Sequence, residues 1–205
     1  MAIAASGLVL VLFALVHLAG LGLAWSDPAA FERYASSLHQ SAWLPVAEAG
    51  LALLLLAHPA QALARALTNR AARGPVLARP RSRRAGGLEP LAALAGRFMA
   101  WSGGLLAVFL LVHLAQLRLR RPAAGEELVA LRTVLHQPHW LALYAAAGVA
   151  LAFHLVHGQE SAHRRLGLLS PRNAAPIRHA GRVLALVIGA GFTLLPFVLV
   201  GAGLP

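Results

Sequence analysis

The stretch Ile3–Trp25, IAASGLVLVLFALVHLAGLGLAW, decides the fold class of this chain. It is apolar from end to end and long enough to cross the hydrocarbon core of a bilayer as a helix. Its only ionisable side chain is His17. The stretch lacks the basic N-terminal region of a signal peptide and is longer than a signal peptide's apolar core. We therefore expect it to be a retained membrane-spanning helix.

Four further stretches have the same character: Leu44–Ala66, Phe98–Leu119, His139–Ser161 and Val183–Leu204. They are continuously apolar and rich in leucine and alanine, whereas membrane β-strands alternate between apolar and polar residues. The sequence therefore predicts an all-α membrane protein, a bundle of five transmembrane helices that forms a single membrane domain over residues 1–205. No internal repeat stands out beyond the alternation of apolar helices and polar loops.

The composition supports a membrane protein and excludes several other classes. Of the 205 residues, 59% are hydrophobic and only 12% are charged, which is more apolar than a soluble domain of this size requires. The 18 basic residues are all arginine, but they lie between apolar stretches and leave no soluble domain for binding nucleic acid. The lack of cysteine excludes disulfides and iron–sulfur ligation, and leaves histidine as the main metal ligand.

The distribution of arginine predicts how the chain is oriented in the membrane. Thirteen arginines lie in the segments 65–97 and 163–182, whereas five lie in the segments 26–43 and 118–138. Because positively charged loops stay in the cytoplasm, we expect a cytoplasmic N-terminus and a C-terminus outside. The two arginine-rich segments are also expected surfaces for membrane lipid or for an acidic partner.

Each of the first four stretches contains one histidine deep within it: His17, His58, His113 and His154. Each histidine lies about two-thirds of the way along its own helix, and successive spanning helices run in opposite directions. His17 and His113 should therefore lie at one depth, toward the outer leaflet, and His58 and His154 at another, toward the inner leaflet. With a rise of about 1.5 Å per residue, roughly 10–15 Å separates the two pairs along the membrane normal.

Two imidazoles from different helices can occupy both axial positions of a haem iron, an arrangement that favours electron transfer over oxygen binding. The two pairs therefore predict an inner and an outer haem within the first four helices. His157 lies on nearly the same helix face as His154, so spacing alone leaves this ligand open. The second ring nitrogen of each ligand needs a partner, most simply a carbonyl one turn earlier. The fifth stretch has no internal histidine and is expected to lie outside the cofactor core.

The segments around these histidines resemble those of one protein family. They are ASGLVLVLFALVHLAG with DPAAFERYASSL, RFMAWSGGLLAVFLLVHLAQL, and YAAAGVALAFHLVHGQESAHRRLGLLSPRN with IRHAGRVLALVIGAGF. In this order they resemble the single-polypeptide, di-haem cytochrome b subunits that anchor succinate dehydrogenase and fumarate reductase in the membrane. The likeness covers nearly the whole chain.

The resemblance implies a function, partners and ligands. The axial ligands of two haem b groups would be His17 with His113 and His58 with His154, which favours His154 over His157. The chain would carry electrons between an iron–sulfur subunit on the cytoplasmic face and a membrane quinone, expected to be menaquinone. Dicarboxylate chemistry would take place on a flavoprotein (FAD) subunit, and the complex would lie in the inner, cytoplasmic membrane. Succinate oxidation and fumarate reduction both remain open.

Two groups of residues outside the histidine pairs are further candidates. Glu48 lies in the outer third of its helix, where a carboxylate is costly, so we expect it to exchange protons with quinone. Basic residues at the inner ends of the third and fifth helices are expected to contact haem propionates. They are Arg97, Arg178, His179 and Arg182. The alternative in each case is an interfacial position, with Glu48 reaching toward water and the basic residues anchoring the helix ends.

Two other functions fit the same pattern. The cytochrome b subunits of nitrate reductase, formate dehydrogenase or hydrogenase also hold haem, but their ligands lie on a different set of helices. A haem-free transporter could use the histidines as a proton path and would show no haem absorption. The chain also departs from the family pattern twice, with Pro59 beside a ligand and with Gln159-Glu160 in place of an aromatic residue. Both departures leave the haem potentials open.

Overall fold

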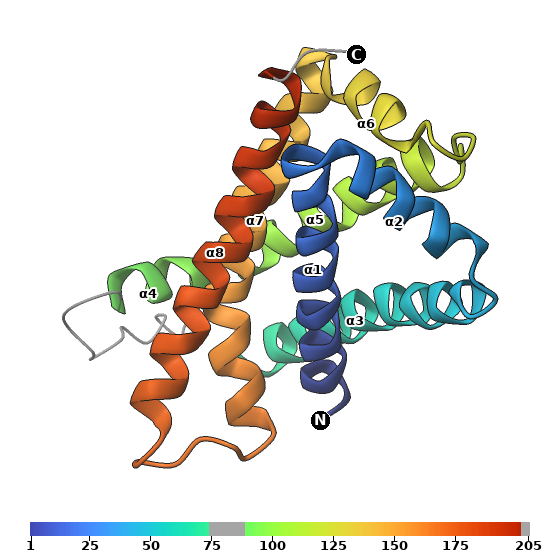
Figure 1. Cartoon of the computed structure of the whole chain (residues 1–205). Helices are drawn as coiled ribbons and strands as arrows, with labels where there is room; N and C mark the ends of the chain where they lie inside the picture. The colour runs from blue at the N-terminus through green and yellow to red at the C-terminus, as the bar shows by residue number, and fades with distance from the viewer. Residues whose placement is uncertain (74–88, 202–205) are drawn as a thin grey trace.

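The computed structural model of the chain describes residues 1–73 and 89–201. Every regular element in these two ranges is a helix (Figure 1). Five helical segments are long and apolar enough to cross a membrane. They are α1 (Ala2–Ser26), α3 (Leu44–Arg73), α5 (Met99–His113) with a π-helical turn (Leu114–Arg118), α7 (Pro138–Arg165) and α8 (Ala174–Gly201). By helix length and composition, the chain is a multi-pass membrane protein.

Three shorter helices lie in connections that the sequence predicts as loops: α2 (Pro28–Gln40), α4 (Glu89–Arg97) and α6 (Glu127–Leu135). The start of α2 is capped by Asp27, whose Oδ1 accepts the Ala30 backbone N–H at 2.9 Å, and Pro28 suits the first helical position. Averaging hydropathy over the length of a membrane span hides helices as short as these. Most of the arginine-rich linker, residues 74–88, lies outside the described residues.

The fifth spanning helix begins earlier than hydropathy predicts. α8 starts at Ala174 instead of Val183, so Arg178, His179 and Arg182 lie on the helix and not before it. Pro176 falls in the first turn, where the missing N–H has no cost. The predicted start is too late because arginine ends an apolar window although it is a good helix former. The predicted end of this helix lies outside the described residues.

α7 and α8 run side by side and form the most extensive helix contact in the described structure (Figure 1). Small residues let their backbones approach, because a Cβ at Gly189 would lie 2.3 Å from the Ala152 Cβ. One apolar core joins this pair to α4 and consists of Ala95, Leu155, Val156, Ala185 and Ile188. A second core lies where α2 and α6 meet the ends of the long helices, and consists of Ala24, Phe31, Leu128, Leu131, Leu135, Tyr144 and Leu199.

The long helices are not all aligned. α3 crosses α1, α7 and α8 at a steep angle, whereas the sequence predicts a bundle of helices that alternate in direction (Figure 1). Packing constrains α3 weakly, because no residue of its membrane-length window is buried. The N-terminus and the α7–α8 connection lie at one end of the molecule, which we call the N-terminal face (Figure 1). α6 and the end of α8 lie at the other end, the C-terminal face.

Candidate functional site

The four histidines of the spanning helices come together in two pairs. The ring centres of His17 on α1 and His113 on α5 are 6.1 Å apart. Those of His58 on α3 and His154 on α7 are 6.3 Å apart. The rings of each pair are steeply inclined, with interplanar angles of 77° and 67°. These are the two pairs that the depths along the helices predict.

His157 lies elsewhere on α7. A Cβ at Gly96 of α4 would be 3.0 Å from His157 Nδ1, so this ring packs against α4. The residue opposite His58 is therefore His154, one of the two candidates that spacing alone leaves open.

Serine hydroxyl groups determine which nitrogen is protonated in the rings of His58 and His154. Ser6 Oγ lies 3.0 Å from His58 Nδ1, and Ser102 Oγ lies 3.4 Å from His154 Nδ1. Each serine also donates to the carbonyl three residues earlier in its own helix, at 3.2 Å in both cases. When the one hydroxyl proton is on that carbonyl, the serine accepts the Nδ1–H of the imidazole. The Nε2 lone pair of each ring is then free to bind a metal.

A tyrosine has the same role for His113. The hydroxyl of Tyr144 on α7 donates to Gln116 Oε1 at 3.1 Å, and it therefore accepts the Nδ1–H of His113 at 3.2 Å. His17 is held by stacking, with ring-centre distances of 5.4 Å to Phe13 and 6.0 Å to Phe192 of α8. The fifth spanning helix thus contributes to this pair, contrary to the expectation that it lies outside the site.

The hydrogen-bond partners also differ from those expected. The sequence predicts a carbonyl one turn earlier on the histidine's own helix, but all three partners are hydroxyl groups on a neighbouring helix. The reason is geometric. A histidine that points across a helix interface turns its second nitrogen away from its own backbone and toward the helix that it faces.

These contacts reveal an internal repeat. Ser6–Ala19, SGLVLVLFALVHLA, and Ser102–Ala115, SGGLLAVFLLVHLA, align without a gap, and the same shift aligns His58 with His154. The two serine–histidine contacts span the same distance in sequence, 52 residues. Hydropathy alone does not reveal this repeat because all five stretches are similarly apolar. Comparing the few polar residues within them would have found it.

The repeat extends to the aromatic contacts. Phe13 stacks on His17 with ring centres 5.4 Å apart, and Phe109 stacks on His113 at 5.5 Å. The α1–α3 half and the α5–α7 half of the molecule are therefore built alike. Each half supplies one histidine to each pair, so each pair joins two equivalent positions of the repeat.

The ring spacing fits one metal ion per pair. A histidine nitrogen lies about 2.0 Å from a bound metal and about 1.2 Å from its ring centre, so two imidazoles on opposite sides of one metal have centres roughly 6.4 Å apart. The observed distances are 6.1 Å and 6.3 Å. Gly7 and Gly103 let neighbouring helices approach the rings, because a Cβ there would lie 3.1 Å from His58 and 3.4 Å from His154.

The donor set suits a haem iron better than a metal bound by the protein alone. Among the described residues, no group of three or more His, Cys, Asp or Glu side chains could hold a metal ion. Two neutral imidazoles without a third protein ligand are what a bis-histidine haem requires, because the porphyrin supplies the other four nitrogens.

Glu48 is held in an ion pair. Arg118, at the end of the π-helical turn, donates from Nε to Glu48 Oε1 at 2.6 Å and from a terminal nitrogen to Oε2. Arg121 lies 3.8 Å from Oε1. Both carboxylate oxygens are occupied, so proton exchange by Glu48 would require Arg118 to move away.

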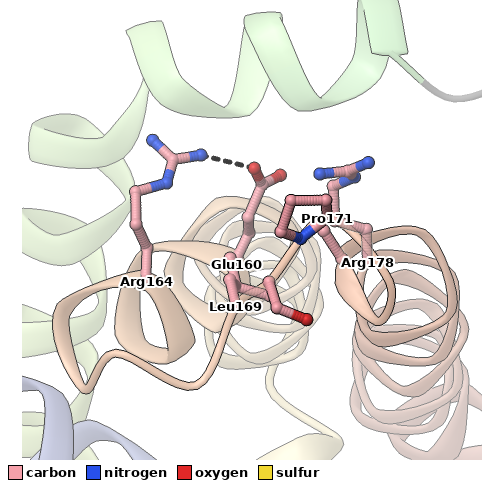
Figure 2. A pocket seen from close by; sticks show the side chains of 7 residues that line it. Glu160, Arg164, Leu169, Pro171 and Arg178 are labelled. Carbon is pink, nitrogen blue, oxygen red and sulfur yellow. Dashed lines mark hydrogen bonds and ion pairs between the residues drawn. The ribbon is translucent and has the colours of Figure 1, made fainter.

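The basic residues near the N-terminal face have different environments. Arg182 is almost buried and donates to Glu89 Oε1 at 2.8 Å, so a propionate there would have to compete with Glu89. Arg178 lines a pocket of about 260 Å³ beside the α7–α8 connection, together with the ion-paired Glu160 and Arg164 (Figure 2). Arg97 ends α4, and both Arg97 and His179 are exposed.

Several residues of the site are not evident from sequence alone. They are Ser6, Ser102, Gln116 and Tyr144. Arg132 on α6 is buried, with 7% of its surface exposed, and within the described part of the chain its Nε has no hydrogen-bond partner. A serine in an apolar helix or an arginine beside leucines is usually unremarkable. Only the repeated Ser-Gly before the two VHLA segments was a usable signal.

Comparison of the chain with protein-family models, with curated proteins and with solved structures found no match.

Proposed function

We propose that the protein is a di-haem cytochrome b, the membrane anchor of a succinate dehydrogenase or fumarate reductase. It carries electrons between an iron–sulfur subunit and a membrane quinone, expected to be menaquinone. The observation that supports this proposal best is the geometry of the histidine pairs. Two rings meet at a centre-to-centre distance suited to one iron, twice in the molecule, and hydroxyl groups leave the Nε2 of three of them unprotonated.

In this proposal His17 and His113 hold one haem and His58 and His154 hold the other. When bound, haem supplies one-electron chemistry, and its closed coordination excludes oxygen. The chain orients the ligands. Ser6, Ser102 and Tyr144 contact Nδ1 of three rings and leave Nε2 of those rings to serve as ligand, and aromatic stacking orients the fourth ring, His17.

Charged residues complete the proposed site. Arg132 needs an anionic partner, because a buried guanidinium without one is costly, and a haem propionate has the required charge. Its helix, α6, packs on Tyr144, the residue that contacts His113, which favours the outer haem. Arg97, Arg178, His179 and Arg182 stay candidates for propionates of the inner haem. Glu48 stays a candidate for proton exchange with quinone.

The proposed orientation places the N-terminal face in the cytoplasm. The sequence supports this orientation, because the segments 65–97 and 163–182 contain thirteen of the 18 arginines, as cytoplasmic loops do. The pair of His58 and His154 is then the inner one, nearest to the iron–sulfur subunit and its flavoprotein (FAD) partner. The protein would lie in the cytoplasmic membrane of the cell and carry no dicarboxylate chemistry of its own.

Haem content of single variants tests the proposal. The purified protein, expressed with haem available, should show two haems per chain in its absorption spectrum. Replacing any one of His17, His58, His113 or His154 by alanine should remove about one haem, because one axial ligand holds it poorly. His157→Ala is the matched control and should keep both.

Two outcomes contradict the proposal. A correctly folded but colourless protein would favour the haem-free transporter. Loss of haem from His157→Ala but not from His154→Ala would refute the assignment of the inner pair. The enzyme family is tested separately, by isolating the chain with an iron–sulfur and a flavin subunit and measuring succinate-dependent reduction of quinone. A haem protein isolated with a molybdenum or nickel subunit would belong to the rival cytochromes.

A further inference from the structure

Two glutamates join α2 and α6 on the C-terminal face, outside the membrane spans. The carboxyl groups of Glu32 and Glu127 lie within hydrogen-bonding reach of each other. Glu127 is buried, and its Oε2 accepts the Gly125 backbone N–H at 2.8 Å. Glu32 Oε1 accepts the Leu128 backbone N–H at 2.9 Å. The start of α6 therefore holds both carboxyl groups in place.

One oxygen of this pair has no donor among the described residues. Glu32 Oε2 is enclosed by protein and receives no hydrogen bond. Two ionised carboxylates side by side would also repel each other. A single proton between the two groups removes both problems, because a protonated carboxyl group donates to its ionised neighbour. A proton shared by the two carboxyl groups would therefore satisfy these contacts.

The electrostatic environment distinguishes the two carboxyl groups. Burial, the hydrogen bond with Glu127 and the charge of Glu127 raise the pKa of Glu32 above its ordinary value. Burial alone would raise the pKa of Glu127 too, but hydrogen bonds with Glu32, the Gly125 backbone and His39 hold it below its ordinary value. Glu32 is therefore the protonated member and Glu127 the ionised one.

A third titratable group connects the pair with solvent. His39, near the end of α2, has its Nδ1 3.1 Å from Glu127 Oε1, and 28% of its side chain is exposed. Glu48 of α3 belongs to a separate cluster, in which it is ion-paired with Arg118 and Arg121. His39 thus gives the buried carboxyl pair a titratable neighbour that reaches solvent.

We propose that Glu32 and Glu127 hold one proton between them and that, with His39, they form a proton-exchange site on the C-terminal face. The exchange begins when a further proton reaches the pair, so that both carboxyl groups are protonated and Glu127 donates to Nδ1 of a His39 ring that carries its proton on Nε2. Glu127 then passes its proton to Nδ1 while the Nε2 proton leaves to water, which restores the state with one proton on the pair. Uptake follows the reverse order. Oxidation of a quinol releases two protons with its two electrons, and this site would conduct them to water one at a time. The role in releasing quinol protons rests on the proposed function, whereas the shared proton does not.

Infrared difference spectroscopy between neutral and alkaline pH tests the shared proton. The wild-type protein should show the carbonyl band of a protonated carboxyl group at neutral pH, with a shift in D2O. Glu32→Gln should remove this band. Glu126→Gln, at an exposed neighbouring position, is the matched control and should keep it. If the wild-type protein lacks the band, or if Glu32→Gln retains it, the proposal is overturned.

Thermal unfolding at different pH values gives a second readout. In the folded protein Glu32 keeps a proton that the unfolded chain releases at the ordinary pKa of glutamate. Stability therefore falls as pH rises from that ordinary value through the raised pKa of Glu32. Glu32→Gln should flatten this slope, and Glu126→Gln should keep it. An unchanged slope in Glu32→Gln would contradict a proton held on Glu32.

The rate of quinol oxidation shows whether the proton-exchange role fails or the proposed function itself fails. With haem content unchanged, Glu32→Gln and His39→Ala should each slow quinol-dependent haem reduction at least about tenfold, because proton transfer by positioned groups contributes this much or more. Unchanged rates in both variants would overturn the exchange role. A protein that binds no haem but shows the carboxyl band would refute the proposed function and leave the shared proton established.

Discussion

At the scale of single residues, hydroxyl groups decide which nitrogen of a histidine can bind a metal. Three of the four paired rings have an Nδ1 partner whose own proton is used elsewhere, on a carbonyl or on Gln116. The tautomer that results is the one that axial ligation by Nε2 requires. The same tautomer in three rings is therefore compatible with the proposed haem function.

Replacing these hydroxyl groups should affect one haem at a time. Ser102→Ala leaves the His154 ring without a partner, and we expect about tenfold weaker binding of the inner haem, with a shifted redox potential. Tyr144→Phe should do the same to the outer haem. Redox titration of the absorption spectrum measures both effects. Each variant serves as a control for the other, and Ser26→Ala, at an exposed serine bonded to its own helix, should change neither haem. Equal effects on both haems would contradict the paired assignment.

The histidines could be predicted from sequence because an ionisable residue stands out in an apolar helix. Their partners could not, because Ser6 and Ser102 are too small and too common in membrane helices to attract attention. Arg132 was counted among loop charges, although it lies on a helix and is buried. Which side chains surround each histidine depends on the angle between helices, and hydropathy contains no information on that angle.

At the scale of secondary structure elements, α7 and α8 make the most extensive helix contact in the described structure. Gly148 and Gly189 lie where the two backbones approach most closely. Apolar side chains gain little by leaving lipid for a helix interface, so close packing of small residues has to stabilise this pair. α7 carries His154 and Tyr144, and α8 carries Phe192, so the same contact positions residues of both histidine pairs.

A methyl group at this contact should destabilise the protein. A Cβ at position 189 would lie 2.3 Å from the Ala152 Cβ, and one at position 148 would lie 2.6 Å from the Thr193 backbone nitrogen. We expect Gly189→Ala to lower the free energy of unfolding by about 1–3 kcal/mol, as overpacking does. Thermal unfolding in detergent measures this change.

Gly104→Ala on α5 is the matched control for this prediction. No atom lies within 4 Å of a Cβ at that position. Alanine favours a helix over glycine by about 1 kcal/mol, so this variant should be as stable as the wild type or more so. A Gly189→Ala variant as stable as the control would show that the α7–α8 contact is looser than the structure indicates.

Elements were predictable to the extent that they are long and apolar. All five spans follow from hydropathy, but α2, α4 and α6 do not, although Asp27-Pro28 is a recognisable helix start. The beginning of α8 was placed too late for a related reason, since Arg178 and Arg182 interrupt the apolar pattern without interrupting the helix. Hydropathy locates the part of a helix that lies in lipid, and not the helix itself.

At the scale of the whole molecule, two similar halves meet at both histidine pairs. The halves, α1–α3 and α5–α7, run through the chain in the same order, and α8 is added after them. The repeat explains which histidines pair, because each pair joins equivalent residues of the two halves. The pairing could be predicted from helix direction alone, whereas the steep angle of α3 could not.

Orientation in the membrane is the remaining property of the whole molecule, and the lack of native cysteine makes it directly measurable. Ser170→Cys places a thiol in the exposed α7–α8 connection on the N-terminal face, and Ala124→Cys places one in the exposed turn before α6 on the C-terminal face. Because the sequence segments 65–97 and 163–182 contain thirteen of the 18 arginines, we expect the α7–α8 connection in the cytoplasm.

A membrane-impermeant maleimide should therefore label Ala124→Cys in intact cells and Ser170→Cys only after the cells are opened. The cysteine-free chain provides the background, and labelling of both variants in detergent verifies that both thiols are accessible. The reverse pattern would exchange the inner and outer histidine pairs. The pair of His17 and His113 would then be nearest to the cytoplasmic partners, and the carboxyl pair of Glu32 and Glu127 would exchange protons with the cytoplasm.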